Sequence, residues 1–205
     1  ALVRNRLDRP WVRENGKLRA GTWAEALDVF AMRLRDAGSK VAAIAGDLVD
    51  AETMFAAKAL LAGQGSTMLE GRQTGLDYDV SSLSAVAFNS TVAGIENADA
   101  ILLIGTNPRW EAPLVNTRLR KAVRRQGAPV FSIGPAVDLT YPVTDIGNDL
   151  SLLGKLPAAV TEAFASAQRP AVIVGPGALG AGALGAALAL VGPLGLLKDS
   201  WNGFN

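Results

Sequence analysis

The chain has 205 residues, of which 20 are basic and 19 acidic, so its formal net charge is +1. Hydrophobic residues make up 49% and charged residues 19%, a balance typical of globular proteins rather than disordered ones. There is no cysteine and no histidine. These absences exclude thiolate nucleophiles, disulfides, cysteine-ligated clusters, histidine bases and imidazole metal ligands from this stretch. The near-neutral charge gives no overall field that would attract nucleic acid or anionic lipid.

We expect a piece of a longer protein, because Ala1 is not an initiator methionine and Ser200–Asn205 form no predicted helix or strand. No N-terminal segment has the order of a signal peptide. The most apolar stretch is Gly177–Leu197, and its unbroken helical part, residues 181–191, is shorter than the ~20 residues that a membrane span needs. A buried helix is therefore the prediction there, without insertion into a membrane.

The first part of the chain predicts a hairpin followed by alternating helices and strands. Residues 7–18 carry Asn15-Gly16, a pair typical of a tight turn between two short strands. Thr22 is a predicted N-cap, and Glu25 would complete a capping box with it. The apolar residues that follow at helical spacing are Trp23, Ala26, Leu27, Phe30, Ala31 and Leu34.

Gly38 should end this helix, and residues 41–45 predict the first buried strand. A helix is predicted from Asp50 or Ala51 to Ala62, and a second strand over residues 66–69. Residues 70–97 predict a long loop with one or two short helices, and a loop of that length is usually functional or packed on a neighbour.

Residues 98–135 form the clearest unit of the sequence. The apolar run of residues 98–104 predicts a buried parallel strand, and the breaker cluster of residues 105–108 follows it directly. Pro113 suits the first turn of the helix predicted over residues 113–125, because its missing N–H needs no partner there. With a strand over residues 128–133, this is one βαβ unit.

The remaining segments complete the predicted fold. They are a loop over residues 136–147, a helix over 150–167 interrupted near Pro157, a strand over 171–174, a helix over 178–191 and a possible strand over 194–197. This order predicts an α/β fold with a parallel, Rossmann-like sheet and helices on both faces. We divide the chain into a hairpin lead-in, residues 1–20, and an α/β domain, residues 21–205.

Two features could bind a ligand. Gly175–Gly180 fits the G-x-G-x-x-G pattern between a predicted strand and helix, but Gly180–Gly185 fits it equally well. A dinucleotide-binding loop of this pattern is normally followed by an acidic residue that binds the ribose, and Asp199 is the only candidate here. Tight packing of strand against helix is therefore the favoured interpretation, with nucleotide binding as the alternative.

The second feature is the turn that carries Asn107, Arg109 and Glu111 after the central strand, at the edge where parallel sheets bind ligands. Asn also stabilises turns through its side chain and Pro108 fixes φ, so we favour a structural role. Glu111 would stabilise the start of the helix. The basic run Arg118–Arg125 lacks interleaved aromatic residues and predicts a solvated or subunit-facing helix surface rather than nucleic-acid binding.

A family resemblance is found in four segments of the chain, residues 105–121, 137–141, 90–96 and 22–27. The sequence Gly-Thr-Asn-Pro-Arg-Trp-Glu-Ala-Pro and the later Asp138-Leu-Thr-Tyr141 resemble the molybdopterin oxidoreductase-like domain of the large iron–sulfur subunit of respiratory complex I. This is the G subunit of the bacterial complex and the 75 kDa subunit of the mitochondrial one. The similarity runs from about Arg6 to Trp201 and implies a molybdopterin-oxidoreductase fold of the formate dehydrogenase or DMSO reductase kind.

The resemblance implies a subunit of the NADH:quinone oxidoreductase of the respiratory chain, placed peripherally on the cytoplasmic side of the bacterial inner membrane or the matrix side of the mitochondrial one. The family's iron–sulfur clusters are expected in the missing N-terminal part of the subunit. For this fragment we predict no catalytic, cofactor-binding or metal-binding residues and a scaffold role against other peripheral-arm subunits. The alternatives are the cofactor-binding portion of a molybdopterin-dependent oxidoreductase, such as formate dehydrogenase or nitrate reductase, and a thiamine-diphosphate-type or nucleotide-binding Rossmann domain.

Overall fold

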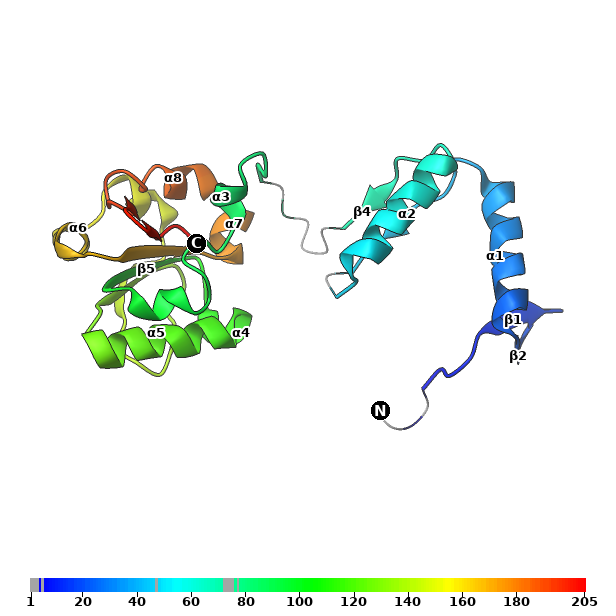
Figure 1. Ribbon diagram of the computed structural model, residues 1–205, viewed down its shortest axis with the longest axis horizontal. Helices are drawn as coiled ribbons and strands as arrows, with labels where there is room; N and C mark the ends of the chain where they lie inside the picture. The colour runs from blue at the N-terminus through cyan, green and yellow to red at the C-terminus, as the bar shows by residue number, and fades with distance from the viewer. Residues whose placement is uncertain (1–3, 5, 47, 72–75, 77) are drawn as a thin grey trace. The chain divides into compact units, whose positions relative to one another are not determined.

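The computed structural model describes residues 4, 6–46, 48–71, 76 and 78–205. The chain divides into two compact units, residues 1–75 (unit 1) and residues 76–205 (unit 2). Figure 1 shows the elements of both units. In the described part of the chain, no helix combines the length and apolar character needed to cross a membrane.

Unit 1 contains a hairpin, two helices and a pair of very short parallel strands. Its elements are β1 (Trp11–Glu14), β2 (Lys17–Ala20), α1 (Trp23–Ala37), β3 (Ala43–Ile44), α2 (Ala51–Gly63) and β4 (Leu69–Glu70). β1 and β2 are antiparallel, and both turn residues, Asn15 and Gly16, have positive φ, as predicted for this turn. The hairpin is confirmed, and the division into domains at residue 20 stays a prediction.

The predicted starts of both helices in unit 1 are confirmed. Thr22 Oγ1 accepts a hydrogen bond from the Glu25 backbone N–H at 3.2 Å, and Asp50 Oδ1 accepts one from Thr53 N–H at 2.7 Å. The Glu25 carboxylate pairs with the Arg19 guanidinium, which is the main cause of its lowered pKa. The backbone N–H of Thr22, the reciprocal half of the capping box, lowers this pKa further.

The prediction of a buried strand over residues 41–45 is wrong in extent and burial. β3 has two residues and pairs in parallel only with β4, at Ala43↔Leu69 and Ile44↔Glu70. The Ile44 side chain is 80% exposed, because no described element of unit 1 covers that side of the strand. The loop predicted over residues 70–97 lies partly outside the described residues.

Unit 2 is an α/β domain around a four-stranded parallel sheet with the strand order β7-β6-β5-β8. Its strands are β5 (Ala100–Ile104), β6 (Val130–Ile133), β7 (Thr144–Gly147), β8 (Pro170–Val174), β9 (Leu197–Lys198) and β10 (Trp201–Asn202). Its helices are α3 (Leu83–Val86), η1 (Gly94–Asn97), α4 (Pro108–Glu111), α5 (Pro113–Gln126), η2 (Leu150–Gly154), α6 (Ala158–Ser166), α7 (Pro176–Gly180) and α8 (Leu184–Leu188).

Two hydrophobic clusters confirm that helices cover both faces of this sheet. On β5, Leu102 and Ile104 join the cluster that contains Phe164 of α6 and Ala187 of α8. The alternate residues, Ile101 and Leu103, join the second cluster, which contains Leu119 of α5. Because successive side chains of a strand point to opposite faces, β5 is buried on both sides. The βαβ unit β5-α5-β6 and the break before Pro157 are also confirmed.

The last residues of the chain add to the sheet, contrary to the prediction that Ser200–Asn205 form no strand. Val172 N–H donates to Gly203 C=O at 2.8 Å, and Asn205 N–H donates to Val172 C=O at 2.9 Å, so the segment runs in parallel beside β8. The Asn205 Oδ1 atom also accepts from Ser90 N–H and Oγ. These contacts span a long stretch of sequence and have no local signal.

Three further differences from the prediction have local causes. The helix predicted over residues 178–191 is split into α7 and α8, because Gly182 has φ +71° and interrupts the helical backbone. The strand predicted over residues 194–197 is a turn at its start, since Leu194 N–H and Leu196 N–H bond back to Leu190 and Val191, and of its residues only Leu197 lies in a strand, β9. β7 lies within the predicted loop of residues 136–147, where its short sequence Thr-Asp-Ile-Gly has no apolar alternation.

Candidate functional site

The carboxyl ends of β5 and β8 mark the place where this kind of sheet usually binds a ligand. From β5 the chain passes through α5 to β6 on one side, while β8 lies on the other side of β5. Successive connections therefore leave the sheet in opposite directions between β5 and β8. In open α/β sheets, ligands bind in the crevice at such a switch point.

Direct packing of the backbone fills this crevice. Gly175 N–H donates to Ile104 C=O and Gly177 N–H donates to Gly105 C=O, both at 2.9 Å. A Cβ atom on Gly105 would lie 2.3 Å from the Ala178 nitrogen, and one on Gly175 would lie 2.3 Å from Thr106 Cβ. The packing role predicted for the glycine-rich tract is confirmed for Gly175 and Gly177, and the prediction that the tract binds no nucleotide remains a prediction.

The neighbouring strand ends are closed in the same way. Gly105 N–H donates to Ile133 C=O at 2.8 Å, and Gly134 N–H donates to Gly147 C=O at 2.9 Å. A Cβ atom on Gly134 would lie 3.3 Å from Gly105 Cα. The glycine N–H groups that could cradle a phosphate at this edge are therefore already bonded within the protein.

The Asn107 side chain does not hold the turn, so that prediction is wrong. The backbone carbonyl of Asn107 accepts from Trp110 N–H at 3.0 Å and from Glu111 N–H at 2.9 Å, because α4 begins directly after it. Asn107 Oδ1 is buried and has no hydrogen-bond partner among the described residues. The Glu111 carboxylate accepts a hydrogen bond from Thr106 Oγ1 at 2.6 Å, across the turn.

Asn107, Arg109 and Glu111 are not brought together into one site in the described structure. Arg109 Nη1 contacts Asp138 Oδ2 at 2.7 Å, and its guanidinium lies 5.8 Å from the ring centre of Trp110. The pKa of Asp138 is lowered first by the hydrogen bond from Thr140 N–H and then by Arg109. Although the backbones of Asn107 and Glu111 are hydrogen-bonded, the side chains of the three residues make no described hydrogen bond or ion pair with one another.

Two residues of the segments that carry the family resemblance, Asn116 and Tyr141, fix the loop after β6 to helix α5. Asn116 is buried, and its Oδ1 accepts from Tyr141 Oη at 2.8 Å. Asn116 Nδ2 approaches Leu139 C=O at 3.4 Å. Burial raises the pKa of the Tyr141 hydroxyl, so the phenol stays protonated and donates. Together with the Arg109–Asp138 pair, these contacts join residues 105–121 to residues 137–141. This structural role was not identified from the sequence.

The basic run of α5 is divided between an internal ion cluster and the surface. The Glu96 carboxylate lies 2.6 Å from Arg118, 3.3 Å from Lys121 and 3.9 Å from Arg125. The pKa of Glu96 is lowered, first by the hydrogen bond from Arg118. Arg120 and Arg124 are exposed and make no ion pair with described residues. The expected solvated helix surface therefore includes these two cations.

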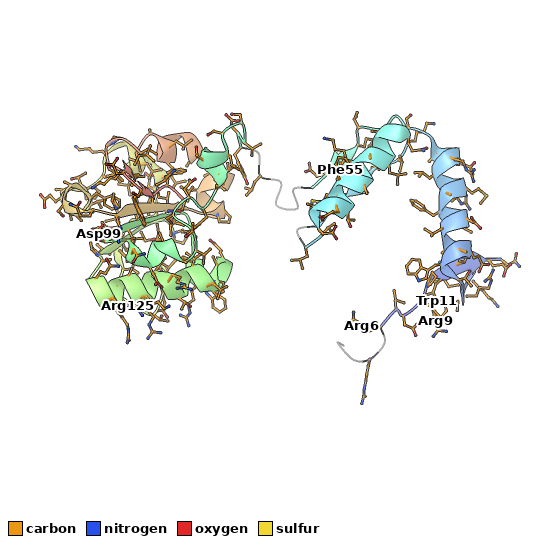
Figure 2. All side chains as sticks on the ribbon, viewed as in Figure 1. Arg6, Arg9, Trp11, Phe55, Asp99 and Arg125 are labelled. Carbon is orange, nitrogen blue, oxygen red and sulfur yellow. The ribbon has the colours of Figure 1, made fainter. Side chains whose placement is uncertain are left out.

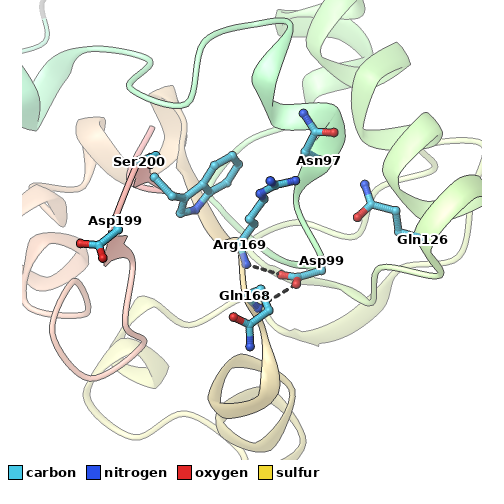
Figure 3. Close-up of a pocket in the computed structure, with 8 residues that line it drawn as sticks. Asn97, Asp99, Gln126, Gln168, Arg169, Asp199 and Ser200 are labelled. Carbon is cyan, nitrogen blue, oxygen red and sulfur yellow. Dashed lines mark hydrogen bonds between the residues drawn. The ribbon is translucent and has the colours of Figure 1, made fainter.

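A polar recess of about 470 Å³ lies at the opposite, amino-terminal edge of the sheet (Figure 3). Its central carboxylate, Asp99, accepts hydrogen bonds from Gln168 N–H at 2.7 Å and Arg169 N–H at 2.8 Å. The indole N–H of Trp201 donates to Pro170 C=O at 2.8 Å. These bonds join the start of β8 to the start of β5 and to β10. The recess therefore lies where strand ends meet, and its polar groups serve that junction rather than converging on a ligand. No pattern in the sequence indicates it.

Ligands for a metal ion do not gather in the described part of either unit. No group of three or more histidine, cysteine, aspartate or glutamate residues there lies close enough to hold an ion. An apolar groove of about 370 Å³ between residues 78–85 and α7–α8 has Tyr78, Leu179 and Leu188 in its walls. Its one carboxylate, Asp79, is exposed and accepts a hydrogen bond from Ser81 N–H at 2.8 Å, so the surface of the groove is mainly aliphatic and aromatic.

The fold and its closed switch point define a doubly wound, Rossmann-like α/β domain whose usual ligand crevice is filled by its own backbone. The sequence matches the molybdopterin oxidoreductase family over residues 6–205, and the chain belongs to this family.

Relatives that match the whole chain are subunits of one enzyme complex. The chain is 38% identical to the NADH-quinone oxidoreductase G subunit of Rickettsia typhi, of which it covers 31%. It is 36% identical to the mitochondrial NADH-ubiquinone oxidoreductase 78 kDa subunit of Candida albicans, of which it covers 30%. It is 34% identical to the mitochondrial NADH dehydrogenase [ubiquinone] iron-sulfur protein 1 of Solanum tuberosum, of which it covers 29%. The resemblance to the complex I subunit is confirmed, and the chain spans about a third of these relatives.

The family name raises the question of whether a pterin dinucleotide fits these residues. Such a group needs an open crevice with N–H donors or cations for its phosphates. Here the glycine N–H groups are bonded internally, the exposed Glu111 carboxylate lies on the turn, and Arg109 is paired with Asp138. Asn107 Oδ1 is one unpartnered acceptor, too little to recognise the group. The described residues of this chain therefore do not fit it.

Proposed function

We propose that this chain is part of the iron–sulfur subunit of complex I and acts as a structural scaffold in NADH-to-quinone electron transfer without a cofactor of its own. The observation that carries the proposal is the backbone packing between Gly105 and Gly177, which occupies the crevice that a cofactor would need. The names of the relatives supply the biological setting. The fragment itself is non-catalytic in this proposal.

The electron-transferring clusters would then be ligated outside this chain, in the N-terminal part of the whole subunit. Cluster ligation requires thiolate or imidazole groups, and the 205 residues contain neither cysteine nor histidine. The scaffold would support that region as part of the peripheral arm, on the cytoplasmic side of a bacterial membrane or the matrix side of a mitochondrial one.

The exposed residues of α4 and α5 are our candidate for the contact with a neighbouring subunit. The Trp110 and Leu114 side chains are 77% and 75% exposed, and Arg120 and Arg124 are exposed further along α5. Trp and Arg are among the residues that most often dominate binding energy at interfaces. The charge favours an acidic partner surface with an apolar recess for Trp110.

The cofactor-binding portion of a molybdopterin-dependent oxidoreductase remains the second candidate. The observation in its favour is the unpartnered Asn107 Oδ1 at the carboxyl end of β5, since buried acceptors normally have a donor. Against it stands the closed crevice beside that atom. A nucleotide-binding Rossmann domain, the third interpretation, needs the same crevice, so the packing of Gly105 against Gly177 counts against it as well.

Two sets of variants in the assembled complex test the scaffold proposal. Arg120→Glu with Arg124→Glu should reduce the amount of complex, while Glu111→Ala should have a smaller effect because it removes one exposed hydrogen bond. NADH oxidation normalised to flavin content should stay at the wild-type level in both. Lys40→Glu, a charge reversal elsewhere on the exposed surface, is the control for charge alone. A large fall in turnover per flavin in Glu111→Ala would contradict the scaffold role.

A further inference from the structure

Unit 1 exposes an apolar surface that its own elements do not cover. We call it the open face; its members are Trp23, Leu27 and Phe30 of α1, Ile44 of β3 and Phe55 of α2, with exposed fractions of 70%, 57%, 54%, 80% and 74%. Figure 2 labels Phe55 on α2. Isolated exposed apolar residues are ordinary, but five large ones on three successive elements are more apolar surface than a folded unit usually leaves to solvent.

The strands of unit 1 need more partners than the described residues provide. Ala43 N–H donates to Met68 C=O and Ala45 N–H donates to Glu70 C=O, both at 2.9 Å. In this parallel register the N–H and C=O groups of the residue between them, Ile44, point away from β4. Parallel strands are almost always buried on both faces, and a pair of strands alone is marginal. β3 therefore presents an open edge.

The helices of unit 1 have the composition of covered helices. α2 carries only Glu52 and Lys58 as charged residues and is apolar around its whole circumference, a pattern typical of a buried helix. On α1, Trp23, Leu27, Phe30 and Leu34 form one stripe, and of these only Leu34 is buried. Both hydrophobic clusters of the described structure consist of residues from unit 2, so the stripe has no cluster of its own.

We propose that the open face is the docking surface for another segment of the same polypeptide, one that adds a parallel strand at the edge of β3 and covers α1 and α2 with apolar side chains. The chain covers 31% of the length of its Rickettsia typhi relative, so such a subunit has ample further sequence to supply the segment. The proposal depends on the greater length of the relatives and on the open edge of β3, and it does not depend on the proposed scaffold role in complex I.

An occupant from the same polypeptide fits better than a second protein. An exposed edge strand with large apolar neighbours promotes aggregation, so natural proteins cover or charge such edges. Ile44, whose N–H and C=O form the open edge, is uncharged and 80% exposed, so its side chain gives the edge no charge and covering is the protection that remains. A segment of the same chain covers it during folding, before any encounter with other subunits, at a high effective concentration.

Hydrogen–deuterium exchange tests the proposal on the full-length subunit, without other subunits, and on the 205-residue chain. The amides of β3 and α2 should exchange on the order of 100-fold more slowly in the full-length subunit, because local opening would then require loss of the added strand. Amides of β5 in unit 2, already in the centre of a sheet, are the internal reference and should change little.

Each other result points to a different cover and contradicts the proposal. Equal exchange in the two proteins would mean that no further segment of the subunit covers the face. Protection that appears only in the assembled complex would assign it to a partner subunit. If the protection of the 205-residue chain rose with its concentration, a second copy of the chain would be the cover. If that chain were protected at every concentration, the open face would need no added segment.

Substitution gives an independent readout. Phe55→Asp and Ile44→Asp should lower the melting temperature of the full-length subunit strongly and that of the shorter chain little, because both side chains are exposed only in the latter. Val80→Asp, at a 66% exposed apolar residue of unit 2, is the matched control and should have a small effect in both. Equal effects of Phe55→Asp in the two proteins would overturn the proposal.

Discussion

The substitution Gly105→Ala tests the packing that closes the switch point. Gly105 has φ +57°, a conformation that costs an alanine about 1–3 kcal/mol. Its new Cβ atom would also lie 2.3 Å from Ala178 N and 2.9 Å from Ala178 Cβ, so β8 and α7 would have to move. Overpacking of this kind costs about 1–3 kcal/mol. The expected loss of unfolding free energy combines the two costs and is about 2–6 kcal/mol.

Gly127→Ala separates the two contributions. Gly127 ends α5 with φ +67°, and a Cβ atom there would have no neighbour within 4 Å. This variant therefore keeps the backbone strain and lacks the collision, so it should lose only about 1–3 kcal/mol.

Thermal unfolding of the two variants, followed by circular dichroism and calorimetry, provides the comparison. For a unit of this size, each kcal/mol corresponds to about 3–5 °C in melting temperature, so a loss of about 2–6 kcal/mol should lower the melting temperature of Gly105→Ala by roughly 6 °C or more. Gly127→Ala should fall by about half as much or less. If Gly105→Ala were no more destabilising than Gly127→Ala, the close approach of the two backbones would not be a rigid feature of the protein, and the closed crevice would lose its support.

Two further variants probe the turn and the ion cluster. Asn107→Leu should change the melting temperature by no more than about 2 °C, because the side-chain oxygen that it removes is buried without a partner; a loss of several degrees would reveal a hydrogen bond in solution. Glu96→Gln should lower the melting temperature at neutral pH. Since the pKa of Glu96 is depressed in the folded protein, its contribution is complete above the ordinary value of 4.5 and is lost as the pH falls through the folded value. The difference between Glu96→Gln and the wild type should therefore shrink on acidification, and a difference that stayed constant would contradict this role of Arg118 and Lys121.

The sequence predicted those parts of the fold whose signal is local. The apolar run of β5, Pro113 at the start of α5 and Gly127 at its end each depend on the chemistry of a few neighbouring residues. The βαβ unit followed from them. The N-caps Thr22 and Asp50 were predictable for the same reason, since capping is a contact over three residues.

The parts that were missed depend on contacts between distant residues. The pairing of residues 203–205 with β8, and the bond from Ser90 to Asn205, join segments that share no pattern. At the candidate site, an amide after a strand predicts a side-chain turn on general grounds, yet the backbone carbonyl of Asn107 makes that turn because α4 starts there. The glycine tract showed the need for close packing, but only the structure identifies Gly105 as its partner.

Unit 1 shows the limit of periodicity in a different way. The stripe Trp23, Leu27, Phe30 on α1 correctly predicted a helix, and it implied a buried face that the described residues do not provide. The spacing of apolar residues predicts that one face of a helix is buried, but it does not predict which segment buries that face.

The most direct test of the scaffold proposal is the molybdenum and pterin content of the full-length subunit, purified from cells that make molybdenum cofactor. Molybdenum is measured by mass spectrometry and pterin by fluorescence after oxidation, both relative to protein. The closed crevice between Gly105 and Gly177 predicts neither in stoichiometric amount, with any iron accounted for by clusters ligated outside residues 1–205. One pterin and one molybdenum per subunit would contradict the account.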